Sequence, residues 1–241
     1  MKHLRTIPIL LAALVSCASS PERVASLECW GEMRNVLREG NTEGRVRIEG
    51  VARPGTWGVG AMEGLEGEIT IYDGNVVLAI VEDEQLTLRE ATKRDQATLL
   101  VLATVDEWRV LGIPEVRNAK DLEYALARAL EATGFDPSID PVPIRIEAEF
   151  PSIALHVLDH SCPIANPEGP PPWRYYGENV TGTLVGIYAE GQAGTLTHHG
   201  QNFHLHAVIR TEDGTTVSGH MDEVALGTDA QLFLPVRAPE R

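Results

Sequence analysis

The sequence is short of positive charge. Its 241 residues carry 20 lysines and arginines against 35 aspartates and glutamates, a formal net charge of -15 at pH 7. A surface of that sign repels phosphate backbones, and no cluster of basic residues interleaved with aromatic ones interrupts it, so we expect no nucleic-acid partner. Internal repeats of the solenoid kind are also missing, which excludes a repeat architecture. The hydrophobic fraction of 43% is that of an ordinary globular protein.

Cysteine is equally scarce, with only Cys17, Cys29 and Cys162 in the chain. None of the three stands in a motif that would support a catalytic thiol. In an oxidising compartment Cys29 and Cys162 could pair as a disulfide, but the sequence alone does not place them near each other. The sequence therefore leaves this disulfide open.

Long apolar runs are missing too, and the N-terminal stretch 9–15 is too short to span a bilayer as a stable helix. It follows Lys2 and Arg5, which supply the basic region of an export signal. The segment 14–17 (LVSC) resembles a bacterial lipobox, in which cleavage precedes lipidation of Cys17. The alternative is a plain secretory signal with an incidental cysteine.

Both interpretations predict an exported protein. We expect a signal peptide at 1–16 and a tether at 17–30 that begins with the lipid-anchored Cys17. The chain would then be a membrane-tethered lipoprotein, periplasmic or on the cell surface, with the anchor as its membrane contact.

Hydrophobic periodicity divides the rest into strands and a few helices. The segment 119–132 has an apolar stripe at helical spacing, begins near Asp121 and stops at Gly134, so it is the clearest helix. A small helix is expected at 31–38. Strands are expected at 46–51, 97–105, 144–150, 153–158, 183–188, 203–211, 217–224 and 231–236, and a hairpin at 68–81 that turns at Asp73 and Gly74.

Prolines mark the breaks between these elements. The stretch 163–173 is too rich in proline to be a central strand. The segment 137–143 interrupts the pattern and suggests a domain boundary. We therefore expect an N-terminal α/β part at 31–136 and a mainly β C-terminal part at 137–241.

Three histidines in the C-terminal part have the spacing of a metal site. His204 and His206 lie two residues apart on a predicted strand, and side chains at i and i+2 point to the same face. His220 follows a polar turn and would lie on the returning strand of the hairpin. The three imidazoles could converge on one ion.

The turn of this hairpin decides whether the site forms. A two-residue turn at 213–214 would place Ala207 opposite His220 and turn His220 away from the other two histidines. A three-residue loop at 212–214 with a left-handed Gly214 places His206 directly opposite His220 instead. We predict the three-residue, bulged loop.

Three neutral imidazoles with one open position suit a catalytic zinc ion, and copper, nickel and iron are alternatives. The structural alternative is that His204 and His206 are polar residues on the solvent side of a strand and that His220 is unrelated to them. His198 and His199 do not match the period of the strand, so we interpret them as loop residues or as support behind the ligands.

Four segments together resemble a known family, the zinc-dependent acetolactate decarboxylases, which convert 2-acetolactate to acetoin and carbon dioxide. The segments are 58–68 (GVGAMEGLEGE), 144–150 (IRIEAEF), 182–186 (GTLVG) and the histidine hairpin, and they occur in the order of the family across most of the chain. The resemblance implies an α/β (α+β) fold in two parts, with mixed, largely antiparallel β-sheets and few helices. It also implies a homodimer and a small keto or hydroxy acid as substrate.

The same resemblance implies zinc ligands at His204, His206 and His220 and a catalytic glutamate at Glu68. Zinc that chelates the ketone and hydroxyl oxygens would stabilise the charge that develops when carbon dioxide leaves. Glu68 could then supply the proton that completes acetoin, provided that burial raises its pKa. The alternative for Glu68 is an ordinary solvent-facing strand residue.

The chain departs from the family at the group that binds the substrate carboxylate. His156 stands where the family has an active-site arginine, and a neutral imidazole does not replace a two-pronged guanidinium. We assign His156 to substrate binding by its position. Arg145 belongs to a structural strand, whereas Arg174 could reach in from a loop.

Two further departures concern the C-terminal tail and the hairpin. The family has a second glutamate beyond the Leu-Pro dipeptide at 234–235, where this chain has only 236–241, and Glu240 is a poor substitute. The histidine hairpin is also three residues longer than is usual, so a bulge must absorb the difference.

Three functions remain open on the sequence. They are a decarboxylase of 2-acetolactate with altered carboxylate recognition, a zinc enzyme for another β-keto or hydroxy acid, and a binding lipoprotein without turnover. A basic group near the open side of the metal would favour the enzymes, because a substrate carboxylate needs a counter-charge. We expect the first.

Overall fold

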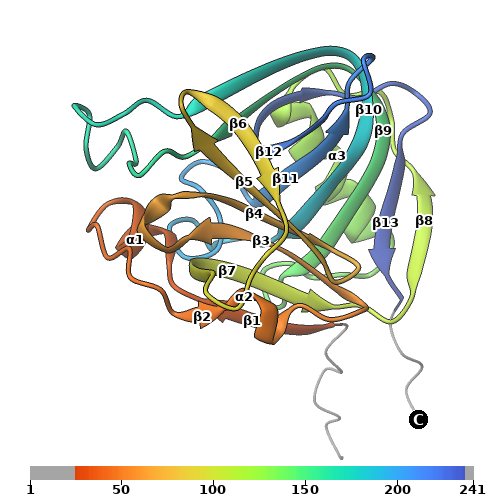
Figure 1. Cartoon of the computed structure of the whole chain (residues 1–241). Helices are drawn as coiled ribbons and strands as arrows, with labels where there is room; N and C mark the ends of the chain where they lie inside the picture. Colours follow the sequence, from red (N-terminus) through yellow and green to blue (C-terminus); the bar gives the residue numbers. More distant parts are fainter. Residues whose placement is uncertain (1–24, 237–241) are drawn as a thin grey trace, which may run out of the picture.

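The structure is a computed structural model that describes residues 25–236 (Figure 1). Two β-sheets make up most of it, every pairing between the named strands is antiparallel, and few helices accompany them. This confirms the α+β fold class. The predicted signal peptide, Cys17, most of the tether and Glu240 lie outside the described residues. Within the described residues, no helix is long and apolar enough to cross a membrane.

The first sheet has the strand order β1-β7-β3-β4-β5-β6, and β2 pairs with β7. Its strands are β1 Ser26–Trp30, β2 Val46–Arg47, β3 Thr56–Met62, β4 Gly67–Tyr72, β5 Asn75–Glu82, β6 Gln85–Arg89 and β7 Gln96–Thr104. The β4–β5 hairpin confirms its prediction, because Tyr72 pairs with Asn75 around Asp73 (φ 49°) and Gly74 (φ 77°). Positive φ at both turn residues is the signature of the tight turn that suits twisted strands.

The second sheet has the order β10-β11-β12-β9-β13-β8, and β10 also pairs with β9. Its strands are β8 Trp108–Gly112, β9 Val142–Val157, β10 Trp173–Tyr188, β11 Phe203–Arg210, β12 Thr216–Ala225 and β13 Gln231–Pro235. Strands β9 to β12 therefore close on themselves, with β13 and β8 attached to the other half of β9. A closed arrangement leaves few exposed strand edges.

The two strands predicted at 144–150 and 153–158 are one continuous strand, β9. Pro151 suggested a break because proline donates no ladder hydrogen bond. In the structure Pro151 lies just beyond the last residue paired with β12, Ser152, and faces the left-handed Asn179 (φ 52°) of β10. A proline is tolerated at such an interruption. The prediction for β10 was also too short, since the strand begins at Trp173.

The helices are α1 Met33–Leu37, α2 Ile48–Val51, the 3-10 turn η1 Glu63–Leu65, and α3 Ala119–Ala132. The predicted bounds of α3 are confirmed, and Asn118 caps it by accepting a hydrogen bond of 2.9 Å from the backbone N–H of Asp121. The strand predicted at 46–51 is wrong beyond Arg47, because 48–51 forms the helical turn α2 that packs Ile48 into the core.

The sheets pack face to face, with β3 and β4 of the first against β10 and β11 of the second (Figure 1). The largest core cluster lies within the second sheet and under α3. Sheet membership changes between Thr104 and Trp108, so β8 and α3 accompany the second sheet. The boundary near 137 stays a prediction. Cys29 and Cys162 are both free, the first exposed and the second buried, so the disulfide is not formed.

Candidate metal centre

A cavity of about 260 Å³ lies between the two sheets. The first sheet contributes Gly60, Ala61, Glu68 and Leu99 to its wall, and the second contributes His156, Arg174, His204, His220 and Asp222. The remaining lining residues come from α1 and from the loops after β9 and β10, and they are Met33, Leu37, Leu158, Cys162, Pro163, Ile164, Pro172 and His198. Most of this wall is apolar. Such a cavity fits a small organic molecule with a few polar groups.

The histidine hairpin has the predicted register. His206 pairs directly with His220. The loop is 212–214, because the backbone N–H of Thr211 donates to the carbonyl of Thr215 at 2.9 Å and Gly214 is left-handed with φ 83°. The longer hairpin is thus absorbed by a glycine bulge, which keeps the histidines on one face.

The three hairpin histidines are buried in the interface between the sheets. His204, His206 and His220 are 3%, 0% and 4% exposed, so the solvent-facing alternative is wrong. Their ring centroids lie 5.1 to 5.5 Å apart, and the Nε2 atoms of His204 and His206 are 3.2 Å apart. The hydroxyl of Thr70 contacts Nδ1 of His206 at 3.3 Å, which fixes that ring from the other side.

A fourth histidine joins the cluster. His198, in the loop between β10 and β11, has its ring stacked on His220 at 4.5 Å and edge-on to His204 at 5.5 Å. One ring nitrogen from each of these three lies within 4.8 Å of the others, a spacing that could hold a metal ion. The sequence correctly placed His198 in a loop. It did not decide whether His198 contacts the metal, because strand periodicity gives no information about the direction of loop side chains.

All four imidazoles are held neutral. Burial is the main cause that lowers the pKa of His206 to about 3 and that of His198 to about 4, and it holds the pKa of His204 and His220 well below 6.5. The neighbouring histidines add to the effect, since one positive ring disfavours another. Neutral rings keep a lone pair free for a metal ion.

The residues fit a zinc ion. Nδ1 of His220 is buried without a hydrogen-bond partner, which is costly unless something else engages it. Two nitrogens bound to a tetrahedral zinc at about 2.0–2.1 Å lie roughly 3.3 Å apart, close to the 3.2 Å between His204 and His206. Imidazole also suits copper, nickel and iron.

Glu68 on β4 reaches this cluster from the other sheet. Its carboxyl is 4% exposed, with Oε2 at 3.6 Å from Nε2 of His206 and Oε1 accepting a long hydrogen bond from the backbone N–H of Leu158. Burial raises the pKa of Glu68 to about 7, although the charge of His156 opposes the rise. The alternative of an exposed Glu68 is therefore wrong, and the raised pKa that its catalytic role requires is present.

His156 belongs to a polar chain at the mouth of the cavity. Its Nδ1 lies 2.6 Å from Oδ1 of Asp222, and Nη1 of Arg174 donates to Oδ2 of Asp222 at 2.8 Å. A carboxylate only accepts, so Nδ1 of His156 carries the hydrogen and Nε2 is left for another partner. Burial raises the pKa of Asp222, but the bonds from His156 and Arg174 outweigh it and hold that pKa below its usual range.

Strand pairing produces this arrangement. His156 pairs with His220 on one side and with Arg174 on the other. Asp222 lies at a register shift, a β-bulge, between Met221 and Glu223. Arg174 thus lies on β10, not in a loop. Sequence reasoning missed Asp222, although an acidic residue two positions after a metal-site histidine on a strand was the available signal.

Arg145 lies elsewhere, as predicted. Its guanidinium packs over the rings of Trp57 and Phe233 at 5.1 and 4.2 Å and pairs with Glu147. These contacts tie the two sheets together through cation–π interactions. Arg145 therefore has a structural role and does not replace the arginine missing at 156.

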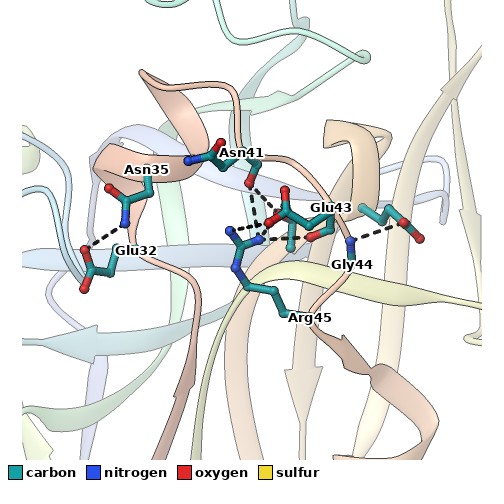
Figure 2. A network of polar contacts seen from close by, with 8 residues as sticks. Glu32, Asn35, Asn41, Glu43, Gly44 and Arg45 are labelled. Atoms are coloured by element: carbon teal, nitrogen blue, oxygen red, sulfur yellow. Dashed lines mark hydrogen bonds and ion pairs between the residues drawn. The ribbon is translucent and has the colours of Figure 1, made fainter.

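A network of polar contacts lies around α1 and the segment that follows it (Figure 2). Arg45, in the segment that follows this helix, donates to the carbonyls of Asn41 and Glu43 and to the hydroxyl of Thr98 on β7, at 3.0 to 3.3 Å. The network attaches the segment after α1 to the first sheet. Met33 of that helix lies in the cavity wall.

Fold and site together describe a two-sheet β-rich protein with a buried imidazole centre. The family model of alpha-acetolactate decarboxylase matches residues 32–236, and the chain belongs to that family. This confirms the resemblance in the sequence. No curated protein matches the chain.

Solved structures agree on the fold. The alpha-acetolactate decarboxylase of Bacillus subtilis strain 168 superimposes with a TM-score of 0.65 at 18% identity, covering 88% of this chain and 86% of that one. That of Bacillus subtilis subspecies spizizenii gives 0.64 at 18% identity with the same coverage. A Staphylococcus aureus protein of unknown function, described as similar to alpha-acetolactate decarboxylase, gives 0.62 at 14% identity, covering 88% and 86%.

Proposed function

We propose that this chain decarboxylates 2-acetolactate to acetoin and carbon dioxide with zinc as its cofactor. The observation that carries the proposal is the buried Glu68, whose pKa is raised to about 7, beside a cluster of neutral histidines. A carboxyl with that pKa is populated in both protonation states near neutral pH, which suits an acid–base catalyst. Membership of the decarboxylase family supports the same reaction.

His204, His206 and His220 would hold the zinc ion. When bound, zinc supplies Lewis-acid polarisation of the ketone and hydroxyl oxygens of a 2-hydroxy-3-keto acid. The bond between the tertiary carbon and the carboxylate breaks, and its electron pair moves toward the ketone oxygen. Protonated Glu68 then donates its hydrogen to the carbon that has lost carbon dioxide, and water reprotonates the carboxylate. The apolar cavity wall limits the access of other water.

His156 and Arg174 supply the substrate-binding end of the cavity. Nε2 of His156 is not used by Asp222, and Arg174 keeps donors beyond the one it gives Asp222. Arg174 offers hydrogen bonds and the counter-charge to a substrate carboxylate. With its hydrogen on Nδ1, His156 can accept a hydrogen bond from a substrate hydroxyl at Nε2, and it donates to a carboxylate only when the ring carries both hydrogens. Asp222 orients both groups, so it acts as a positioning residue.

A second candidate is a related reaction on another keto or hydroxy acid. Arg174 is already paired with Asp222, and the remaining wall is largely apolar. This favours a substrate with a larger apolar group and a weaker demand for carboxylate binding. Binding without turnover is the third function left open by the sequence, and Glu68 has no evident use in it.

The deciding experiment is acetoin formation from racemic 2-acetolactate by the mature protein, zinc-loaded and chelator-treated in parallel. We expect acetoin only from the loaded protein, and much less from a Glu68→Gln variant that keeps its zinc. Stoichiometric zinc without acetoin would reject 2-acetolactate as the substrate. Acetoin from chelator-treated protein would reject the role of the metal.

We also propose that the protein is exported and anchored through a lipid on Cys17. The support is the lipobox-like segment 14–17. Metabolic labelling with a radioactive fatty acid should mark the wild type and not Cys17→Ala, and the variant should leave the membrane fraction. A variant that stays with the membrane would contradict the anchor. The homodimer implied by the family is a separate proposal, to be checked by light scattering.

A further inference from the structure

The position of His198 suggests more than support for the three predicted ligands. It forms part of the cavity wall together with His204 and His220, whereas His206 is fully buried. Its ring contacts His204 and His220, and so does the ring of His206. An ion bound by His204 and His220 would therefore have His206 on one side and His198 on another.

The spacing of the rings is that of ligands around one ion. An imidazole bound to zinc at about 2.0–2.1 Å has its ring centre roughly 3 Å from the ion, so two ligands of a tetrahedral site have ring centres about 5 Å apart. The contacts of His198 with His204 and His220 are 5.5 and 4.5 Å, and those among the hairpin histidines are 5.1 to 5.5 Å. The ring of His198 is about as close to those of His204 and His220 as the ring of His206 is.

The loop that carries His198 is fixed at both ends. The backbone N–H groups of Met33 and Arg34, at the start of α1, donate to the carbonyls of Thr195 and Gly194 at 3.1 and 2.8 Å. After His198, the Asn202 side chain donates to Glu123 on α3 at 2.9 Å. The backbone at His198 is thus held in place, and its ring is delivered to the cavity at little entropic cost.

We propose that His198 is a fourth imidazole ligand of the metal and that a chelating substrate takes its place. The proposal rests on the metal centre of the proposed function. A closed shell of four protein ligands is typical of structural zinc, whereas catalysis needs an exchangeable position. His198 is the one histidine of the cluster that is carried by a loop and is partly exposed to the cavity, so it is the ligand that can yield.

The exchange is a simple ligand substitution. The bond between a ring nitrogen of His198 and the metal breaks, and an oxygen of the incoming hydroxy acid bonds instead, with no change of oxidation state. The strand-borne ligands stay in place. In this way the resting centre is protected from water and adventitious anions until a bidentate molecule enters.

X-ray absorption at the zinc edge tests the ligand directly on the wild-type chain, since it counts the imidazoles bound to the ion. We expect four in the wild type and three in His198→Ala and in His198→Gln, the second of which keeps the size of the side chain. Exposed His199, whose Nε2 lies beside Gly194, provides the matched control, and His199→Ala should keep four. Zinc affinity in a competition with a chelator should fall at least about tenfold in both His198 variants.

Glycolate, a bidentate hydroxy acid, tests the exchange. It should lower the imidazole count of the wild type from four to three and leave that of His198→Ala at three. Free imidazole should restore a count of four to His198→Ala. Three imidazoles in the resting wild type, with acetoin formed normally, would overturn the role of His198 and leave the proposed function standing. A wild type that binds no zinc would overturn both, and four imidazoles in the wild type with glycolate bound would overturn the exchange.

Discussion

The metal centre and the mouth of the cavity are built in different ways. His204, His206, His220 and Glu68 stand on paired strands, are 0% to 4% exposed, and meet where the two sheets face each other. At the mouth, His156, Asp222 and Arg174 are partly exposed and depend on a bulge and on one another. This fold therefore separates a rigid centre from a rim, formed by His156, Arg174 and Asp222, that can change with the substrate.

The largest effect should follow from removing a strand-borne ligand. His206→Ala deletes a fully buried ring that contacts both His204 and His220. We expect zinc affinity to fall by more than about a hundredfold, since loss of a mere supporting residue already costs 10–100-fold. Zinc content after dialysis, with circular dichroism to verify folding and His199→Ala as control, checks this. Stoichiometric zinc in a folded His206→Ala protein would contradict the assignment.

The second largest effect is expected from changing Glu68, whose carboxyl faces this centre. Glu68→Gln keeps the shape of the side chain but removes its acid–base function, so turnover of 2-acetolactate should fall about 10²–10⁴-fold while zinc stays bound. Glu66, an exposed residue that caps η1 two positions before Glu68, provides a control as Glu66→Gln. Equal turnover in Glu68→Gln and Glu66→Gln would remove Glu68 from the mechanism.

The raised pKa of Glu68 also predicts how stability depends on pH. Because burial raises this pKa from 4.5 to about 7, the folded chain holds the proton more tightly than the unfolded chain does. The contribution of the Glu68 carboxyl to the free energy of unfolding is fully present below pH 4.5 and is lost as pH rises to about 7. The expected loss is about 3 kcal/mol in metal-free protein.

Urea unfolding of chelator-treated protein across this pH range measures the effect. The four histidines of the cluster act with the opposite sign, since their lowered pKa values destabilise the fold as pH falls below 6.5. Glu68→Gln keeps those histidines, so the difference between wild type and variant isolates the carboxyl. A difference that does not change with pH would show that Glu68 is not desolvated.

Sequence periodicity was sufficient for the strand-borne centre. Two histidines at i and i+2 share a face on any strand, and the left-handed glycine at 214 is a local feature that sets the register with His220. The bounds of α3 followed in the same way from its apolar stripe and its stop at Gly134. Such features depend on neighbouring residues alone.

The features outside this strand-borne centre depended on tertiary structure and were only partly predictable from the sequence. Asp222 meets His156 because β12 pairs with β9, and His198 enters the cavity because α1 holds its loop. Pro151 misled the strand prediction because its tolerance depends on where β12 stops pairing. Each of these contacts joins segments 66 to 162 residues apart, and a local pattern does not encode the partner across such a separation.

The smallest expected effect is at the mouth itself. Arg174→Gln removes the guanidinium that donates to Asp222 at 2.8 Å but keeps a side chain that can donate one weaker hydrogen bond. Its side chain is 47% exposed, so solvent screens much of its charge. We expect the KM for 2-acetolactate to rise about tenfold, with kcat changed much less and zinc retained, because the lost interaction holds the substrate and does not reach the reacting bond.

Arg109→Gln, an exposed arginine on β8 far along the second sheet, is the matched control and should leave KM unchanged. Asp222→Asn should act in the same direction as Arg174→Gln, since it removes the charge that orients Arg174 and His156. A fall in kcat without a change in KM would instead place Arg174 at the reacting bond. The rim would then belong to the catalytic machinery, and the separation between a rigid centre and a substrate-selecting mouth would fail.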